Sequence, residues 1–252
     1  MTEPEAPRPS AVRWYYGSIA GFMIPSGIQA VLLSYLLAIE LKQPADRFGV
    51  MQMLGQLPML LLLLVGGWAA DRFDARRTLM TAQLLGLVMP VVLAAQLWSG
   101  VVSEAVVLLY AMAWGTVSAF AMPARDGLLN RVAGGQVQKV VTMSMGILFG
   151  TQMLGQGLAG RAGHWGPIGI LAIQCVTLML GILATSRLPA RTTPAPTSAL
   201  SAIGRELADG LAVLFRHEAI RPVFLLLCGM GMFFAGVFVV LIPLAVRDLY
   251  AG

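Results

Sequence analysis

The chain has 252 residues, of which 58% are hydrophobic and only 12% are charged. Soluble domains average about 45–50% apolar and about 25% charged residues, so this composition excludes an ordinary soluble protein and indicates an integral membrane protein. The formal net charge of +5 could suggest a nucleic-acid partner, and the distribution of the basic residues has to decide that question.

Seven apolar segments are long enough, at about 20 residues each, to cross a bilayer. In chain order they are 16–39, 49–69, 78–98, 103–122, 139–160, 167–186 and 222–245. The first follows a Pro-rich, charged leader and begins with Trp14, Tyr15 and Tyr16, which is too aromatic a start for a cleaved signal peptide. The sequence therefore predicts an all-α, multi-pass membrane protein that keeps its first helix.

The basic residues are distributed unevenly between the two sides of the membrane. If the N-terminus is cytoplasmic, only Lys42, Arg47, Arg161 and Arg247 of the 17 lysines and arginines fall on the opposite side. By the positive-inside rule this bias predicts a cytoplasmic N-terminus in the cell's inner (cytoplasmic) membrane. The positive charge orients the chain in the bilayer and is poor evidence for a nucleic-acid partner.

One connection is longer than the others. Residues 187–221 begin with the Pro/Thr-rich stretch PARTTPAPTS, which is typical of a flexible linker. Apolar residues then recur at helical spacing and predict an amphipathic helix on the cytoplasmic surface: Ile203, Leu207, Leu211, Leu214 and Phe215. We therefore divide the chain into a six-helix bundle (1–186), a cytoplasmic linker (187–221) and one further helix (222–252).

The loop between the second and third spans concentrates charges beside a glycine. It contains Gly67, Asp71, Arg72, Asp74, Arg76 and Arg77. This arrangement resembles the signature of the major facilitator superfamily of secondary transporters, roughly G-x-x-x-D-R-x-G-R-R/K in the same loop. Asp74 stands where many members have glycine, and in this the chain is similar to the enterobactin-exporter-like branch.

The resemblance implies two six-helix halves around a central cavity and gives this loop the role of a latch. The latch holds the halves together on the cytoplasmic side while the protein faces outward, and it releases when they rock. A glycine such as Gly67 lets another helix approach closely, and a carboxylate such as Asp71 can face a helix N-terminus or an arginine. Alternatively, the arginines only anchor the loop in the cytoplasm; for Gly67 and Asp71 we favour the latch.

A second cytoplasmic motif follows the fourth span. The stretch MPARDGLLNRV, residues 122–132, resembles a segment of enterobactin-exporter-like proteins and contains Pro123, Arg125 and Asp126. We expect Pro123 to end the fourth helix near the cytoplasmic surface. Arg125 either pairs with the aspartates of the first loop or stays solvated.

Glycines recur along the fifth span at Gly146, Gly150, Gly155 and Gly160. Small residues permit close helix packing in lipid. The segment 155–160 also resembles the family's antiporter motif, but Gln156 stands where that motif has proline. We therefore favour a packing seam over a coupling element.

Polar and aromatic residues inside the spans are the candidates for a substrate cavity. Gln29 lies near the predicted midplane of the first span, and a lone amide facing lipid would cost several kcal/mol, so it should turn inward. Similar stripes occur in the second and fourth spans: Gln52 and Gln56, and Tyr110, Trp114 and Ser118. An inward amide or aromatic residue can equally serve helix packing.

Other classes of protein fit the residues less well. The only lysines, Lys42 and Lys139, lie outside the apolar centre of any span, which excludes a retinal protein. No nucleophile–base pair or clustered metal ligands point to an enzyme, and no cofactor or metal is predicted. Because proton relays generally need an ionisable group inside the membrane, proton coupling is implied only by the resemblance.

The sequence thus predicts a secondary active transporter, an exporter of small drug-like or siderophore-like molecules that works by alternating access. Its expected partners are the lipid bilayer, a small-molecule substrate and a C-terminal six-helix half that we expect to be missing from this chain. The alternative is a non-transporting remnant of such a transporter.

Overall fold

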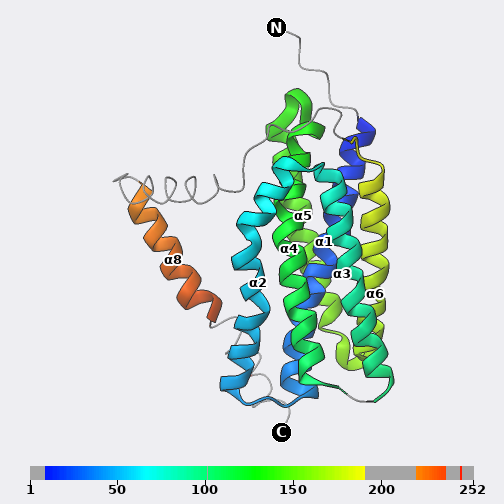
Figure 1. Cartoon of the computed structure of the whole chain (residues 1–252), viewed down its shortest axis with the longest axis vertical. Helices are drawn as coiled ribbons and strands as arrows, with labels where there is room; N and C mark the ends of the chain where they lie inside the picture. The colour runs from blue at the N-terminus through cyan, green and yellow to red at the C-terminus, as the bar shows by residue number, and fades with distance from the viewer. Residues whose placement is uncertain (1–8, 101, 191–219, 237–244, 246–252) are drawn as a thin grey trace.

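The computed structural model describes residues 9–100, 102–190, 220–236 and 245, and the described parts are almost entirely helical. Six long helices form one bundle (Figure 1). They are α1 (Pro9–Tyr35), α2 (Ala45–Arg72), α3 (Ala75–Trp98), α4 (Glu104–Ala133), α5 (Val137–Ala159) and α6 (Ala162–Ser186). A π-helical turn, η1 (Leu36–Glu40), ends the first span, and a 3₁₀ turn, η2 (Gly134–Gln136), reverses the chain between α4 and α5.

The helices of the bundle are long and apolar enough to cross a bilayer. Five uninterrupted helical stretches meet both conditions, and one of them, Glu104–Ala159, contains α4, η2 and α5. Gly166 interrupts α6 with a φ of 73°, so a regular helix starts at Pro167, where the sequence predicts the sixth span to start. Proline is favoured at a first helical position because its missing N–H would be unpaired there in any case.

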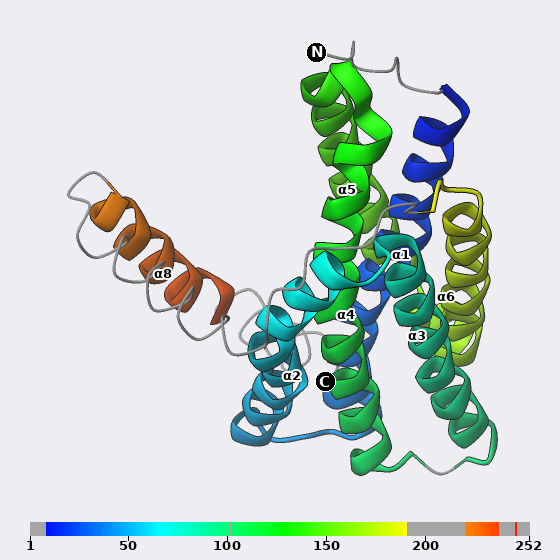
Figure 2. The same ribbon diagram turned by 45° about the horizontal axis from the view of Figure 1, so that its top comes forward.

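Helix α8 (Ile220–Gly236) follows the linker and stands apart from the bundle in both views (Figures 1 and 2). It contains residues 222–236 of the seventh predicted span. The predicted amphipathic helix of the linker, with Ile203, Leu207, Leu211, Leu214 and Phe215, lies outside the described residues, as do residues 237–244 of the seventh span.

The bundle packs with an internal two-fold pattern. Helix α2 packs on α4 as α5 packs on α1, and α3 packs on α4 as α6 packs on α1. The pairs α3–α6 and α1–α4 complete the pattern, so exchanging the first three helices with the last three leaves these six pairs, the most extensive in the bundle, unchanged. Such 3+3 repeats are typical of transporter bundles. The arrangement puts α1 and α4 at the centre, flanked by α5 and α2.

Glycines mark the points where these helices cross. A methyl group added at Gly27 or Gly155 would overlap backbone atoms of Gln152 or Ile24, respectively, which shows how closely α1 and α5 approach. Gly21 of α1 and Gly181 of α6 face each other in the same way. Between α2 and α4, a methyl group added at Gly115 would lie 2.6 Å from the Gly55 carbonyl oxygen. Close packing of this kind stabilises helix pairs in lipid, where the hydrophobic effect gives no help.

The prediction that Pro123 ends the fourth helix is wrong. Helix α4 continues through Pro123 to Ala133, more than two turns further. Proline has no N–H, so the Ala119 carbonyl loses its helical donor. Gly66 of α2 lies directly against that carbonyl, and a glycine Cα–H can make a weak contact with a carbonyl oxygen. Neighbouring helices can compensate for proline in this way inside a membrane protein, and they leave α4 free to continue.

Candidate functional site

The candidate latch occupies the short connection between α2 and α3. Helix α2 ends at Arg72, and Asp74 precedes the first residue of α3. Aromatic rings pack beneath this connection: the Arg72 guanidinium lies over the Trp68 ring at 5.4 Å, and the Trp68 and Phe73 rings meet edge to face at 6.0 Å. A cation–π contact of this kind holds the arginine against the end of its own helix.

Two further contacts fix the connection to the rest of the bundle. Arg131 Nη1 of α4 lies 3.1 Å from Asp74 Oδ1, with 28% of the Arg131 side chain and 12% of the Asp74 side chain exposed. Arg76 donates a hydrogen bond to the carbonyl of Ser186, the last residue of α6. A cation at this position also complements the negative end of the helix. The start of α3 is thereby tied to both α4 and α6.

Neither of the two arrangements that the sequence leaves open for Arg125, pairing with the aspartates of the first loop or an unpaired solvated side chain, is found among the described residues. Arg125 Nη2 instead lies 2.8 Å from Asp126 Oδ1, its own neighbour in α4. Its backbone carbonyl accepts a hydrogen bond from the Tyr15 hydroxyl at 3.3 Å. Because α4 runs on past Pro123, Arg131 reaches the level of the loop and makes the ion pair. The sequence reasoning missed Arg131 because it ended the helix too early.

Gly67 and Asp71 are one turn apart on α2, so they share a face of that helix. A methyl group added at Gly67 would meet no atom within 4 Å, and Asp71 is exposed at the surface of the bundle. Arg77 is exposed as well. The close approach predicted for Gly67 is therefore not found among the described residues, and the neighbouring Gly66 makes the close approach to α4 instead.

Most of the candidate cavity residues lie within the helix packing. Tyr110 is fully buried, and its hydroxyl donates a hydrogen bond of 2.9 Å to Gln174 Oε1 of α6. The Trp114 ring stacks on Phe22 of α1 with 5.5 Å between ring centroids. Ser118 is also buried. Tyr110 thus contacts α6 and Trp114 contacts α1, and a role of these residues in binding substrate stays a prediction.

The candidate glutamines occupy more varied places. Gln52 is nearly buried and donates a hydrogen bond of 3.0 Å to Ser34 of α1, so it links α2 with α1. Gln29 is half-buried, and Gln56 is exposed on α2. Of the three candidate glutamines, Gln29 and Gln56 are therefore the accessible ones.

A buried polar network joins α1, α3 and α6, and the sequence analysis did not identify it. Ser18 and Thr185 share a hydrogen bond of 2.6 Å, and Thr185 Oγ1 donates to Gln83 Oε1 at 3.1 Å. All three residues are at most 1% exposed. Ser18, Gln83 and Thr185 stand out in the sequence as polar residues inside apolar spans. The sequence does not show, however, that the three spans bring these side chains together.

The predicted packing glycines of α5 differ from one another. Only Gly155 lies at a close crossing, against Ile24 of α1. A methyl group added at Gly146 or Gly150 would meet no atom within 4 Å. One added at Gly160 would approach only the preceding turn, at Gln156 and Gly157. The expectation of one continuous seam through all four glycines is therefore wrong for the described bundle.

Comparisons with known proteins agree with this architecture. A solved POT peptide transporter in complex with alafosfalin is similar to the chain with a TM-score of 0.64 and 16% identity, over 92% of this chain and 51% of that one. A bacterial homologue of the human drug peptide transporters PepT1 and PepT2 gives a TM-score of 0.57 and 14% identity, over 92% and 56%. At these identities the likeness shows the fold alone. The chain spans about half the length of these transporters.

No curated protein matches the chain at significant similarity. The family model of the major facilitator superfamily, in contrast, matches residues 16–251, which is nearly the whole chain. Its match includes the loop between α2 and α3 and all of the bundle except the first turns of α1. On this evidence the chain belongs to the major facilitator superfamily.

Proposed function

We propose that this chain is the N-terminal half of a secondary active transporter that exports small molecules by alternating access. Membership of the superfamily and the two-fold packing of the bundle support transport. The likeness of its cytoplasmic motifs to enterobactin-exporter-like proteins supports export of a drug-like or siderophore-like solute. The basic residues at the loop ends support a cytoplasmic N-terminus in the inner membrane.

The open face of α2 at Gly67, one turn before Asp71, is the observation that supports the latch. Arg131 and Arg76 tie the start of α3 to α4 and α6, next to the end of α2 that contains Asp71. Nothing described would obstruct a helix that packs against Gly67. In the proposed mechanism a helix of the second six-helix half packs there in the outward-facing state, with a positive group or helix N-terminus facing Asp71.

Transport requires that this contact break when the two halves rock. A contact worth about 0.3–2 kcal/mol at a helix end is strong enough to bias two conformations and weak enough to open at each cycle. Proton coupling rests on the family resemblance, and the proton carrier is then expected in the second half. Gln29 and Gln56, the accessible amides, are the proposed substrate contacts from this half.

An efflux measurement tests the proposal. The complete gene is expressed in cells that lack their native exporters, and accumulation of a panel of fluorescent drug-like dyes is followed. Asp71→Asn should abolish efflux of any dye that the wild type exports. Asp46→Asn serves as the matched control, because Asp46 is exposed in the first turn of the same helix, at the opposite end from Asp71, and this variant should retain efflux. Unchanged efflux in Asp71→Asn would remove the latch from the proposal.

The alternative of a non-transporting remnant predicts a different pattern. Neither the complete gene nor any variant would then lower dye accumulation, although the chain would still insert in the membrane. The observation that supports this alternative is that the chain covers only 51% of the solved transporter that it resembles.

A further inference from the structure

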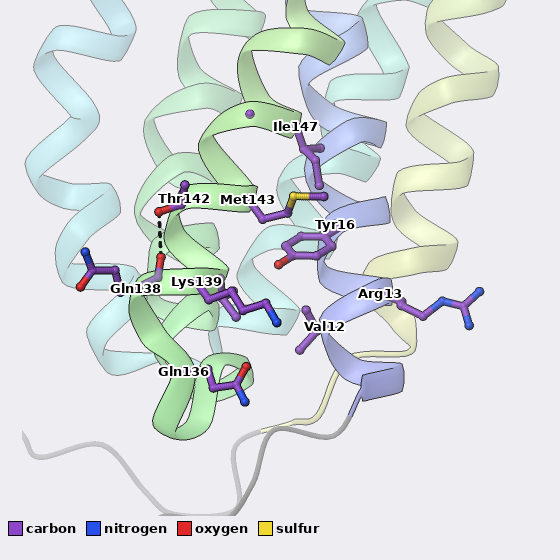
Figure 3. A pocket seen from close by; sticks show the side chains of 11 residues that line it. Val12, Arg13, Tyr16, Gln136, Gln138, Lys139, Thr142, Met143 and Ile147 are labelled. Atoms are coloured by element: carbon purple, nitrogen blue, oxygen red, sulfur yellow. Dashed lines mark hydrogen bonds between the residues drawn. The ribbon is translucent and has the colours of Figure 1, made fainter.

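Helices α1 and α5 form a groove that opens toward the end of the bundle where both begin. They pack closely further along their length, where Gly27 and Gly155 allow backbone contact. Toward their N-terminal ends they diverge around a pocket of about 1210 Å³. Figure 3 shows this space between Val12 and Tyr16 of α1 and the first turns of α5.

The lining of this pocket combines positive charge with an apolar wall. Lys139 reaches from α5 toward α1, and Arg13 stands at the rim and points away from α5 (Figure 3). The 11 lining residues include these two cations and no acidic residue. Deeper in the groove the wall is formed by Met143, Gly146 and Ile147.

The pocket also lies at the level expected for the membrane interface. Ser10 begins the first membrane-length helix. Trp14, which is 43% exposed, lies under the Arg187 guanidinium at 5.7 Å, and this pairing of tryptophan with a cation is typical of the headgroup region. This end of the bundle also bears the arginines of the α2–α3 connection. Anionic headgroups are attracted to such an end.

We propose that this groove binds an anionic phospholipid from the leaflet on the N-terminal side of the membrane. The phosphate lies near Lys139, and one acyl chain runs into the groove past Met143 and Ile147. Gly146 leaves room for that chain, since an added methyl group there would meet no atom within 4 Å. Gly150, one turn further along α5, is equally open and extends the path. The inference needs only that the chain spans a membrane, and it does not depend on the proposed transport.

The test measures lipid retained by the purified 252-residue chain in neutral detergent, by native mass spectrometry. Phosphatidylglycerol is compared with phosphatidylcholine that has the same acyl chains. Wild type should prefer phosphatidylglycerol. Because a lysine near an anionic headgroup contributes about 1 kcal/mol, Lys139→Gln should weaken retention of phosphatidylglycerol about fivefold. Lys42→Gln, which changes the same residue type at the opposite end of the bundle, should leave retention unchanged.

A second pair of variants tests the groove without changing charge. Gly146→Leu fills the path of the acyl chain and should lower phosphatidylglycerol retention, whereas Gly157→Leu, at another open position of α5, should not. Both substitutions add a side chain into open space, so both should fold.

Three results would overturn the proposal. The first is equal retention of the two lipids, or an equal loss in Lys139→Gln and Lys42→Gln. The second is a competition result: if glycerol 1-phosphate displaces bound phosphatidylglycerol at the same concentration as competing intact lipid does, the acyl chains add nothing to binding and the ligand is a soluble anion. The third comes from a phosphatidylglycerol with a photoreactive acyl chain: labelling should fall on α1 and α5, and exclusive labelling of other helices would place the lipid elsewhere.

Discussion

The contact between Gly66 of α2 and the Ala119 carbonyl of α4 gives a sharp prediction about stability. In Gly66→Ala the new methyl group would lie 2.7 Å from the Ala119 carbonyl carbon and 3.2 Å from the Phe120 Cα, and closer still to the carbonyl oxygen. These are backbone atoms of a helix that packs along most of α2, so no side chain can rotate away. Helices α2 and α4 must separate.

The neighbouring Gly67 supplies the matched control. Gly67→Ala adds the same methyl group, in the same helix, where nothing lies within 4 Å. Replacing glycine by alanine inside a helix gains up to about 1 kcal/mol in helix propensity, and this gain applies to both variants and cancels in their difference. Overpacking of a tight interface costs about 1–3 kcal/mol. Gly66→Ala should therefore be less stable than Gly67→Ala by about 1–3 kcal/mol.

The assay is reversible unfolding of the purified chain in mixed micelles, with a rising fraction of denaturing detergent, followed by tryptophan fluorescence and circular dichroism. The midpoint for Gly66→Ala should fall below that of wild type, and the midpoint for Gly67→Ala should equal or exceed it. Equal midpoints for the two variants would refute the reasoning, because they would show that α2 and α4 do not approach at Gly66.

Further predictions concern the other contacts of the bundle. A double-mutant cycle with Asp74→Asn and Arg131→Gln should give a coupling energy of about 0.2–1 kcal/mol that shrinks at high salt, and a coupling of zero at low salt would contradict the ion pair. Tyr110→Phe should cost about 1–3 kcal/mol because it leaves the buried Gln174 amide without its donor, whereas the double variant with Gln174→Leu should recover part of that loss; no recovery would show that the two side chains do not interact. Gly155→Ala should lower the unfolding midpoint and Gly157→Ala should not, and the reverse order would place the crossing of α1 and α5 elsewhere on α5.

The sequence allowed the membrane class, the positions of the bundle spans and the family to be predicted, because these depend on patterns that are local in the chain. Apolar length defines a span, and the start of the regular helix at Pro167 could be read from a single residue. The loop with Asp71 and Arg76 could be identified in the same way. Each of these features is determined by residues close together in the sequence.

Features that depend on two helices could not be predicted in the same way. Pro123 is a helix breaker in isolation, but in the bundle Gly66 packs against the carbonyl that proline leaves unpaired, and α4 continues. The same continuation makes Arg131, and not Arg125, the partner of Asp74. Likewise, the sequence does not show which of two adjacent glycines faces α4. Pairing across the bundle has to be seen in three dimensions.

The central claim is that the face of α2 with Gly67 and Asp71 receives a helix from a second bundle. The most direct measurement is photo-crosslinking from a benzoylphenylalanine placed at position 67 in the complete gene product, in native membranes, with a probe at Gly49 as the control because that position is also open. The account predicts that the probe at position 67 crosslinks to protein of a second six-helix half, and that Asp71→Asn reduces the yield. Crosslinks to lipid alone, at the same level as from position 49, would contradict it.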